Sequence, residues 1–374
     1  MPEYRQYELG SVCARLSSGK GIPASQVFSE GAFPVYGGNG LRGYTDHSNF
    51  RGDCAIIGRQ GAFCGNVRYF NGEAYMTEHA VVVCADECHN THYLAYLLSQ
   101  MNLGRLSGQS AQPGLSVKTL AKQVIELPSL DVQNKVVAVL SSLDSKIALN
   151  EKINDNLEWQ AQSYFQELFV DNADPEWTTG TISELGTVVG GSTPSKAKPE
   201  YYTESGIAWI TPKDLSINKS KFVSHGENDI TELGLRNSSA SLMPEGTVLF
   251  SSRAPIGYIA IAAGEVTTNQ GFKSVVPKPE IGTPFVYFFL KNTLPVIEGM
   301  ASGSTFKEVS GSTMKNVPAV IPDAETLAKF SDFCTPIFAQ QRILEEQNQT
   351  LVALRDSLLP KLMSGEIDVS AVQL

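Results

Sequence analysis

The chain has 374 residues, of which 42% are apolar and 18% charged, and its formal net charge is −10. This composition is globular, and the length suits two domains of ordinary size. With no leader, no apolar run long enough to cross a bilayer, and six cysteines too scattered for a disulfide framework, we expect a cytoplasmic protein with reduced thiols.

The first segment, residues 1–128, predicts short strands, turns and one apolar helix. Its turn signals are YGGNG, RQGAFCGN and SGQSAQPG, and its helix candidate is HYLAYLL (92–98). The run HAVVVCADECHNTH contains His79, Cys84, Cys88, His89 and His92, a set that could bind zinc. Because the matching stretch of the second half contains neither cysteine nor histidine, we expect no metal site here.

Residues 129–174 predict a long helix followed by a linker. Apolar residues with polar interruptions are spaced alternately by four and three, from Val136 to Leu168. A heptad pattern sustained over this length indicates the seam of a coiled coil. From residue 132 to 168 such a helix measures roughly 54 Å at 1.5 Å per residue.

Residues 175–322 repeat the plan of the first segment. At a shift of 194, RGDCAIIGR (51–59) lies over EGTVLFSSR (245–253), and LSVKTLAKQVIELP (115–128) lies over VSGSTMKNVPAVIP (309–322). After a small change of register, HYLAYLL matches the apolar run TPFVYFFL (283–290). The sequence therefore predicts two similar mixed domains.

Residues 323–374 carry the same heptad ladder 194 residues after the first, from Phe330 to Leu362. Two matched seams predict an antiparallel coiled coil, in which Asn154 would face Gln341 and Ile147 would lie near Asn348. The predicted seam residues are Leu140, Leu143, Ile147, Asn154, Leu157, Ile337, Gln341, Leu344, Asn348 and Leu351. The alternative is that each helix is an independent amphipathic helix covering its own domain.

The predicted fold class is therefore α+β: two mixed domains separated by two long helices in an antiparallel coiled coil, with pseudo-twofold symmetry. The predicted segments are 1–128, 129–174, 175–322 and 323–374. In the last helix, Pro360 predicts a bend in the final turn, and Ser364 and Gly365 predict an exposed, glycine-capped end. The tail EIDVSAVQL would then be free to lie back across the first domain.

The common signatures of nucleotide and catalytic chemistry are missing. GGSTPSK (190–196) lacks the second glycine of a phosphate-binding loop, and neither a G-x-G-x-x-G fingerprint nor an N-P-P-Y-like run occurs. The one compact D-x-K, Asp144 to Lys146, falls on the heptad helix, where a solvated flank explains it. We therefore expect no catalytic residues.

The net charge argues at first against a nucleic-acid partner. However, residues 131–174 and 323–374 carry net charges of −5 and −4, so both mixed domains are nearly neutral and could gather cations on one face.

The loops of both domains carry isolated cations, amides and aromatic side chains suited to DNA. Arg can bind guanine bidentately, Asn or Gln can bind adenine, and Lys can bind phosphate. In the first domain the candidates are Lys20, Tyr36, Asn39, Arg42, Arg59, Gln60, Arg105, Gln109 and Gln112. In the second they are Lys196, Lys198, Lys213, Arg236, Arg253, Asn269, Gln270, Thr305 and Lys307. Since ordinary surface loops are polar too, we expect part of this set to be plain surface.

Two mixed domains alternating with two heptad helices resemble the specificity (S) subunit of type I restriction-modification enzymes over nearly the whole chain. The most specific stretches are LRDSLLPKLMSGEID (354–368) and the first helix with its exit. WITPKDL (209–215), SSRAPIG (251–257) and TNQGF (268–272) also resemble stretches of the family's target recognition domains. The first domain departs more, with VYGGNG in place of WITPKDL and TEHAV in place of TNQGF.

The resemblance implies a DNA-reading scaffold without catalytic residues of its own. Each target recognition domain would read one half of a bipartite site in double-stranded DNA, and the coiled coil would set the unread spacer. Two methyltransferase (M) subunits using S-adenosylmethionine would dock on the helices, and restriction (R) subunits using ATP and Mg²⁺ would join them. The chain itself would bind no cofactor.

Two other classes of function stay open at this point. One is a stand-alone nuclease or methyltransferase with an unfamiliar active site, which an isolated metal- or S-adenosylmethionine-dependent activity on DNA would favour. The other is a structural coiled-coil adaptor, which sequence-specific DNA retention with a methyltransferase partner would exclude.

Overall fold

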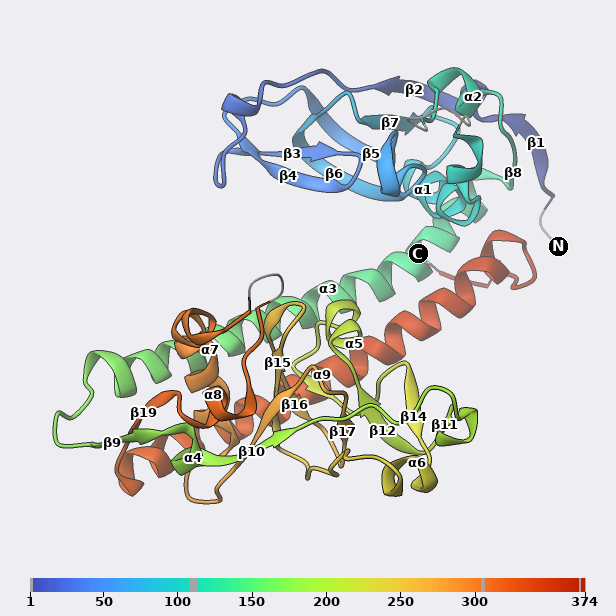
Figure 1. Ribbon diagram of the computed structural model, residues 1–374. Coiled ribbons are helices and arrows are strands. Elements are labelled where there is room, and N and C mark those ends of the chain that lie inside the picture. Colours follow the sequence, from blue (N-terminus) through green and yellow to red (C-terminus); the bar gives the residue numbers. More distant parts are fainter. Residues whose placement is uncertain (1–2, 108–113, 304–306, 370, 374) are drawn as a thin grey trace. The chain divides into compact units, whose positions relative to one another are not determined.

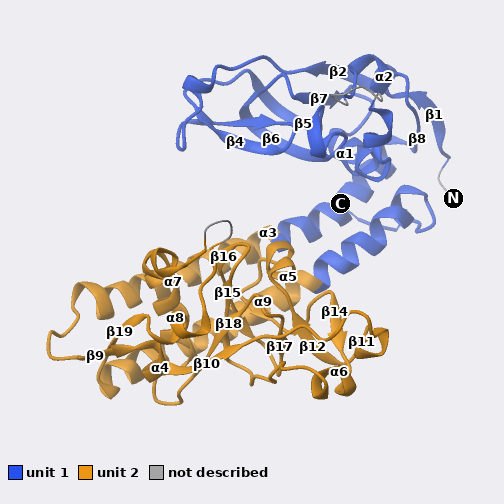
Figure 2. Cartoon of the chain, in the orientation of Figure 1, with its two compact units in different colours: residues 1–147, 350–374 blue, residues 148–349 orange. Residues whose placement is uncertain are grey.

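The computed structural model describes residues 3–107, 114–303, 307–369 and 371–373 (Figure 1). The chain divides into two compact units, coloured separately in Figure 2. Unit 1 contains residues 1–147 and 350–374, and unit 2 contains residues 148–349. Each unit therefore includes one mixed domain and a stretch of both long helices.

The domain of unit 1 is built on one mixed sheet with the strand order β2-β7-β5-β6-β3-β4 (Figure 1). Its strands are β2 (Cys13–Ser18), β3 (Phe33–Gly37), β4 (Gly40–Thr45), β5 (Phe50–Gly58), β6 (Val67–Met76) and β7 (Ala80–Ala85). β3 runs parallel to β6, and the other neighbours are antiparallel. The second half of β5, Cys54 to Gly58, is buried, which places this strand at the centre of the core.

Helix α1 (Thr91–Gln100) packs on this sheet, and the Asn90 side chain caps it by accepting the Tyr93 N–H. A second strand pair, β1 (Arg5–Glu8) with β8 (Val124–Leu127), and the short helix α2 (Val117–Ala121) complete the unit. Leu94 and Leu98 of α1 share one buried cluster with Ile57 and Val81 of the sheet. Helix and sheet therefore bury their apolar faces against each other.

Unit 2 repeats this plan with its sheet divided in two (Figure 1). One sheet has the order β10-β18-β15-β16-β13, and the other has the order β11-β14-β12-β17. The first contains β10 (Gly186–Gly190), β13 (Phe222–Val223), β15 (Val248–Ser252), β16 (Ile256–Ala262) and β18 (Lys273–Pro277). The second contains β11 (Tyr202–Thr203), β12 (Ile207–Ile210), β14 (Asn228–Ile230) and β17 (Thr267–Thr268).

The division arises where the long strand β6 of unit 1 has two counterparts in unit 2. β16 pairs with β15, whereas β17 pairs in parallel with β12, as the end of β6 pairs with β3. The helices of the unit 2 domain are α4 (Ile182–Leu185), α5 (Pro212–Ile217), α6 (Glu232–Arg236), α7 (Thr283–Met300) and α8 (Gly311–Lys315). The pair β9 (Thr178–Thr181) with β19 (Pro318–Ile321) corresponds to β1 with β8.

The two long helices are α3 (Leu130–Gln166), which continues as a π-helical turn at Glu167–Asp171, and α9 (Ala324–Met363). In unit 1, Asp144 of α3 pairs with Arg355 of α9 at 3.0 Å. In unit 2, the Asn150 amide donates to the Asn348 oxygen at 2.8 Å. Within the same unit, the Gln341 amide donates to the Asn154 backbone oxygen at 3.2 Å. The residue number therefore rises on α3 as it falls on α9, and the helices are antiparallel.

The predicted fold class is thus confirmed in its two similar α+β domains and its antiparallel coiled coil. Leu140, Ile337, Gln341 and Leu344 are buried. The other predicted seam residues, Leu143, Ile147, Asn154, Leu157, Asn348 and Leu351, are half-buried. Gln341 faces Asn154 as predicted, but its amide donates to the backbone oxygen of Asn154 at 3.2 Å, and the side-chain amide pair is Asn150 with Asn348.

The end of α9 follows its sequence signals in part. The helix continues through Pro360 to Met363, and Gly365 then adopts a φ of +74°. Gly365 is buried and not exposed as expected, because a Cβ there would come within 2.9 Å of the Tyr4 ring. Val369 of the tail is buried in the core cluster of unit 1, so the tail does lie on the first domain.

Candidate nucleic-acid interface

In unit 1, several loops meet at one edge of the sheet. The Lys20 N–H donates to the Met76 oxygen at 2.9 Å, the Thr77 N–H to the Tyr36 oxygen at 2.9 Å, and the Arg59 N–H to the His79 oxygen at 2.9 Å. These bonds bring together the ends of β2, β3 and β5 and the β6–β7 turn. We call this region, with the neighbouring β3–β4 turn, the first polar edge.

Most candidates of the first domain lie on the first polar edge. Lys20, Asn39 and Arg42 are exposed, and Arg59 is half-buried with its guanidinium 3.5 Å from the Ser18 hydroxyl. Tyr36 packs on the Phe70 ring with 5.0 Å between centroids. Within the described ranges, Lys20, Arg42 and Arg59 form no ion pair with a carboxylate, so their charges are available to an anionic ligand.

One cation of this edge, Arg68, is not among the residues predicted from the sequence. Gly40 has a φ of +96°, and a Cβ added there would come within 2.8 Å of the Arg68 guanidinium. Arg68 therefore lies against the β3–β4 turn, where only glycine leaves room for it. In sequence it is an ordinary polar residue of a strand, and its long side chain carries the charge to the turn.

Unit 2 builds a second polar edge with the same hydrogen bonds. The Ser192 N–H donates to the Thr268 oxygen at 2.9 Å, and the Asn269 N–H donates to the Ile210 oxygen at 3.0 Å. Ser192 thus takes the place of Lys20, and Asn269 takes the place of Thr77. The sequence resemblance between the halves is therefore matched by equivalent backbone bonds at the candidate site.

The sequence overlay of Arg59 on Arg253 is wrong by one residue. The Arg59 N–H donates to His79 and its oxygen accepts from Leu115, whereas in unit 2 the N–H and oxygen of Ser252 make the matching bonds, to Gly271 and Val309. The counterpart of Arg59 is thus Ser252. Strands buried on both faces lack the polar alternation that fixes register in sequence, which explains the slip.

Arg253 nevertheless lies on the second polar edge. Its guanidinium is 3.5 Å from the Glu308 carboxylate, which also lies 3.8 Å from the Lys273 ammonium. Burial lowers the pKa of Lys273, and Glu308 opposes that shift. Arg253, Lys307 and Glu308 line a cavity of about 620 Å³, so Arg253 borders open space as well as its partner.

The two amide candidates of this edge, Asn269 and Gln270, form hydrogen bonds with neighbouring residues of the same edge. The Asn269 side chain accepts the Gly271 N–H at 2.8 Å, and the exposed Gln270 accepts a hydrogen bond from the Thr193 hydroxyl. Asn269 is therefore committed to shaping the turn, whereas Gln270 presents its amide at the surface.

Two of the remaining candidates pair with carboxylates of their own unit. Lys213 pairs with Glu227 at 2.6 Å and Arg236 pairs with Glu232 at 3.6 Å. Three others are exposed: Lys196, Lys198, whose ammonium lies 5.2 Å from the Tyr201 ring centroid, and Arg105, which lies in the short 3-10 helix Leu103–Leu106. Gln109, Gln112 and Thr305 fall outside the described residues.

Among the described residues, no three His, Cys, Asp or Glu side chains lie close enough together to hold a metal ion. Over the same residues, no helix is both long and apolar enough to cross a membrane.

Comparison with known proteins identifies the family. The family of type I restriction modification DNA specificity domains matches residues 1–159 and again residues 175–353. The chain belongs to this family. Each match contains one mixed domain with its polar edge and part of one long helix.

Two curated relatives carry related names. The chain is 37% identical over 197 residues to the type I restriction enzyme MjaIX specificity subunit of Methanocaldococcus jannaschii, covering 50% of this chain and 45% of that protein. It is 36% identical over 147 residues to the EcoprrI specificity subunit of Escherichia coli, covering 38% of this chain and 36% of that one. The chain thus spans less than half the length of either relative.

A solved structure shows the fold over nearly the full length. The type I restriction-modification S subunit from M. genitalium superposes with a TM-score of 0.66 at 17% identity, covering 96% of each chain. The arrangement of two mixed domains and two long helices is thus that of a solved S subunit.

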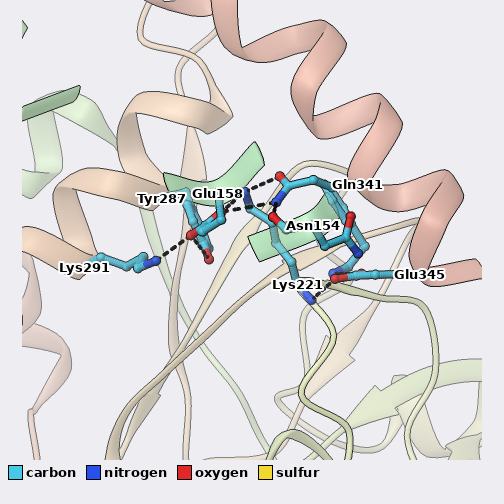
Figure 3. A network of polar contacts seen from close by, with 8 residues as sticks. Asn154, Glu158, Lys221, Tyr287, Lys291, Gln341 and Glu345 are labelled. Carbon is cyan, nitrogen blue, oxygen red and sulfur yellow. Dashed lines mark hydrogen bonds and ion pairs between the residues drawn. The ribbon is translucent and has the colours of Figure 1, made fainter. Parts of the chain in front are cut away.

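In this specificity-domain chain, unit 2 fastens its domain to both helices through a buried polar network. Figure 3 shows the Lys221 ammonium directed at the Glu158 carboxylate of α3, 2.7 Å away, and at the Gln341 oxygen of α9, 2.8 Å away. Lys291 of α7 reaches the other oxygen of Glu158 at 2.5 Å, and the Tyr287 hydroxyl donates to it at 3.2 Å. We call these five side chains the Glu158 network.

The charges of the Glu158 network support one another. Burial raises the pKa of Glu158, but the ammonium groups of Lys221 and Lys291 outweigh it and bring the pKa to about 2. Burial lowers the pKa of Lys221 to about 8, although Glu158 favours its charged form. The Lys221 ammonium also lies 3.5 Å from the centroid of the Phe338 ring. A buried cation with a carboxylate, an amide and a ring as partners fixes its segment in one place.

Unit 1 makes a smaller contact of the same kind. The Tyr96 hydroxyl of α1 donates to Asp144 of α3, which also pairs with Arg355 of α9. Each mixed domain of the specificity-domain chain is therefore joined to the coiled coil through a carboxylate on α3 shared by a tyrosine and a cation.

Proposed function

We propose that this chain is the DNA sequence-specificity subunit of a type I restriction-modification system. Each mixed domain is a target recognition domain that reads one half of a bipartite site in double-stranded DNA. The observation that carries the proposal is the twofold match to the specificity family, with one polar edge in each matched copy.

The chemistry of the polar edges suits DNA. Exposed Lys20 and Arg42, without ion pairs among the described residues, are suited to phosphates. Arg59 and Arg253, each beside a sheet end and partly fixed by a neighbour, are suited to base edges in the major groove. The halves offer different side chains at equivalent places, as expected if they read different bases.

The chain acts as a scaffold for catalytic partners. Two methyltransferase subunits using S-adenosylmethionine dock on it, restriction subunits using ATP and Mg²⁺ join them, and this chain binds none of these cofactors. The formal charge of −10 supports this division, because little net electrostatic attraction to DNA comes from the chain alone. The methyltransferases supply much of the backbone affinity.

The test is to map adenine methylation on DNA exposed to the reconstituted complex of this chain with its methyltransferase. We expect one bipartite motif with two fixed half-sites and a constant unread spacer. The chain alone should bind DNA weakly and gain affinity with the methyltransferase. Methylation without a shared motif, or methylation by this chain alone, would contradict the proposal.

A further inference from the structure

Each unit contains an apolar pocket at the carboxyl end of one long helix. In unit 2 the cavity measures about 310 Å³ and is lined by Phe169, Trp177, Phe289 and Ala319, among others. In unit 1 it measures about 520 Å³ and is lined by Tyr4, Leu97, Ile125 and Met363, among others. Neither pocket belongs to a polar edge.

The two pockets are built from equivalent positions. Tyr4 directly precedes β1 and Trp177 directly precedes β9, strands that pair alike with β8 and β19. Leu97 and Phe289 are each the seventh residue of their helices, α1 and α7.

The long helices and the paired strands repeat the same correspondence. Met363 and Phe169 are separated by 194 residues, the spacing of the two heptad ladders, as are Ile125 and Ala319. The internal repeat has thus preserved a concave apolar surface, and not only the core beneath it.

The mouths of both pockets expose apolar side chains. Val124 of β8 is 59% exposed at the unit 1 pocket, and Val320 of β19 is 43% exposed at the unit 2 pocket. Val170, which also lines the unit 2 pocket, is 42% exposed. Apolar side chains gathered around a hollow gain free energy when a partner covers them.

Carboxylates lie at or beside both pockets. Glu126 lines the unit 1 pocket. Glu3 precedes Tyr4 and pairs with Arg5 at 3.6 Å, and Glu176 precedes Trp177 at the equivalent place. Around the unit 2 pocket, Asp171 and Asp323 are exposed as well, and Asp323 accepts the Trp177 indole N–H at 2.9 Å. Among the described residues, Glu176, Asp171 and Asp323 form no ion pair. The complementary ligand is an apolar side chain flanked by lysine or arginine.

We propose that the two pockets are equivalent anchor points for two copies of the methyltransferase subunit. Each copy inserts one large apolar side chain and places an adjacent basic residue beside the carboxylates. The inference rests on the proposed function, which supplies a partner present twice. A site that occurs twice with equivalent lining recognises the same surface twice, whereas the two polar edges differ in their side chains because they read different bases.

The test compares single variants of the two exposed valines. Val124→Asp and Val320→Asp place a charge at the mouth of one pocket each, at positions exposed enough to leave the cores intact. Val296→Asp, on an α7 residue that is 51% exposed and lines neither pocket, is the matched control. The stoichiometry with the methyltransferase subunit of the same system is measured by native mass spectrometry.

We expect the unmodified chain and the Val296 variant to bind two methyltransferase copies. Each single pocket variant should retain one copy, and the double variant none. Two copies on every variant would overturn the anchor inference while leaving the proposed function standing. No complex even with the unmodified chain would overturn the proposed function and the inference with it.

The charge argument is tested separately in unit 2. Asp171→Asn combined with Glu176→Gln should weaken binding of the second copy severalfold at low salt and leave it unchanged at high salt, because exposed charges are screened. Equal binding at low salt would remove the basic flank from the proposal. Val320→Asp tests the apolar contact, and the variant that lacks two of the rim carboxylates tests the electrostatic one.

Discussion

At the scale of single residues, Arg253 is the side chain that we propose as a base contact on the second polar edge. The Arg253 side chain is 36% exposed, and its guanidinium pairs with Glu308. Arg253 also lines a cavity on the second polar edge. A partly fixed arginine loses less conformational freedom on binding than one free in solvent.

We expect Arg253→Ala to weaken recognition of the second half-site by about 1–3 kcal/mol while the first half-site stays equally specific. The measurement is the binding of the methyltransferase complex to DNAs altered base by base in either half-site. Lys307→Ala, which removes an exposed cation of the same cavity, is the comparison and should weaken all sequences alike. If Arg253→Ala also weakens all sequences equally, Arg253 is a phosphate contact.

Glu158 makes the stability of unit 2 sensitive to acid. Its pKa in the folded chain is about 2, against an ordinary 4.5, so its contribution is complete above about pH 4.5 and is lost as the pH falls toward 2. Glu158→Gln should therefore destabilise unit 2 at pH 6. The free-energy difference from the unmodified chain should shrink by about 2 kcal/mol between pH 6 and pH 3.

Urea unfolding followed by hydrogen exchange in α7 measures this difference. Glu227→Gln is the control, because Glu227 pairs with Lys213 at 2.6 Å with both side chains more than 60% exposed. Pairs of that kind contribute little to stability, so this variant should track the unmodified chain at every pH. A constant penalty for Glu158→Gln from pH 6 to pH 3 would mean that the carboxylate is not held ionised by Lys221 and Lys291.

At the scale of elements, the heptad ladders predicted α3 and α9 and their antiparallel direction. The alternation of four and three residues is a property of the sequence, so it is visible without coordinates. Which polar seam residues meet is not visible, because small axial shifts of one helix change the partner. Asn154 and Asn150 differ by one turn, and the structure places the side-chain amide pair at Asn150.

The coiled coil should act as the ruler of the unread spacer. The contact at Asp144 and the Glu158 network fasten one domain each, so added helix between them changes only the spacer. Inserting one heptad into both helices, after Ile147 and after Gln349, adds about 10 Å of helix, close to three base pairs. We expect methylation mapping to return the same half-sites with a longer spacer.

The control carries the heptad in α3 alone. It breaks the facing of Asn150 with Asn348 and should lower the melting temperature without producing a defined new spacer. An unchanged spacer in the double insertion would exclude the ruler.

At the scale of the whole molecule, most of the correct predictions from the sequence depended on the internal repeat. It gave two domains and the family resemblance, and it drew attention to loops that do gather at Lys20, Arg42 and Arg59. It did not reveal Arg68, because the sequence does not show that the guanidinium of this strand residue lies beside Gly40. It also could not find Lys221, whose partner Glu158 lies 63 positions away in the chain on a different element.

The one-residue error in the overlay of Arg59 on Arg253 also arose because the sequence does not show tertiary contacts. Two strands that are apolar throughout align almost equally well when one is shifted by a residue. The correct alignment is shown by the hydrogen bonds that Leu115 and Val309 donate to Arg59 and Ser252. The register of these strands is therefore defined by tertiary contacts and not by the periodicity of the sequence.

The location of Trp209 on the second polar edge has a spectroscopic consequence. Its indole N–H donates to the Ser192 oxygen at 3.0 Å, on the second polar edge, and the other two tryptophans of the chain, Trp159 and Trp177, also belong to unit 2. All the indole emission of the chain thus originates in one half. If each mixed domain reads one half-site, as proposed, we expect DNA carrying only the second half-site to change this emission directly and DNA carrying only the first half-site to leave it unchanged. Intrinsic fluorescence of the chain would then distinguish the two recognition events without a label.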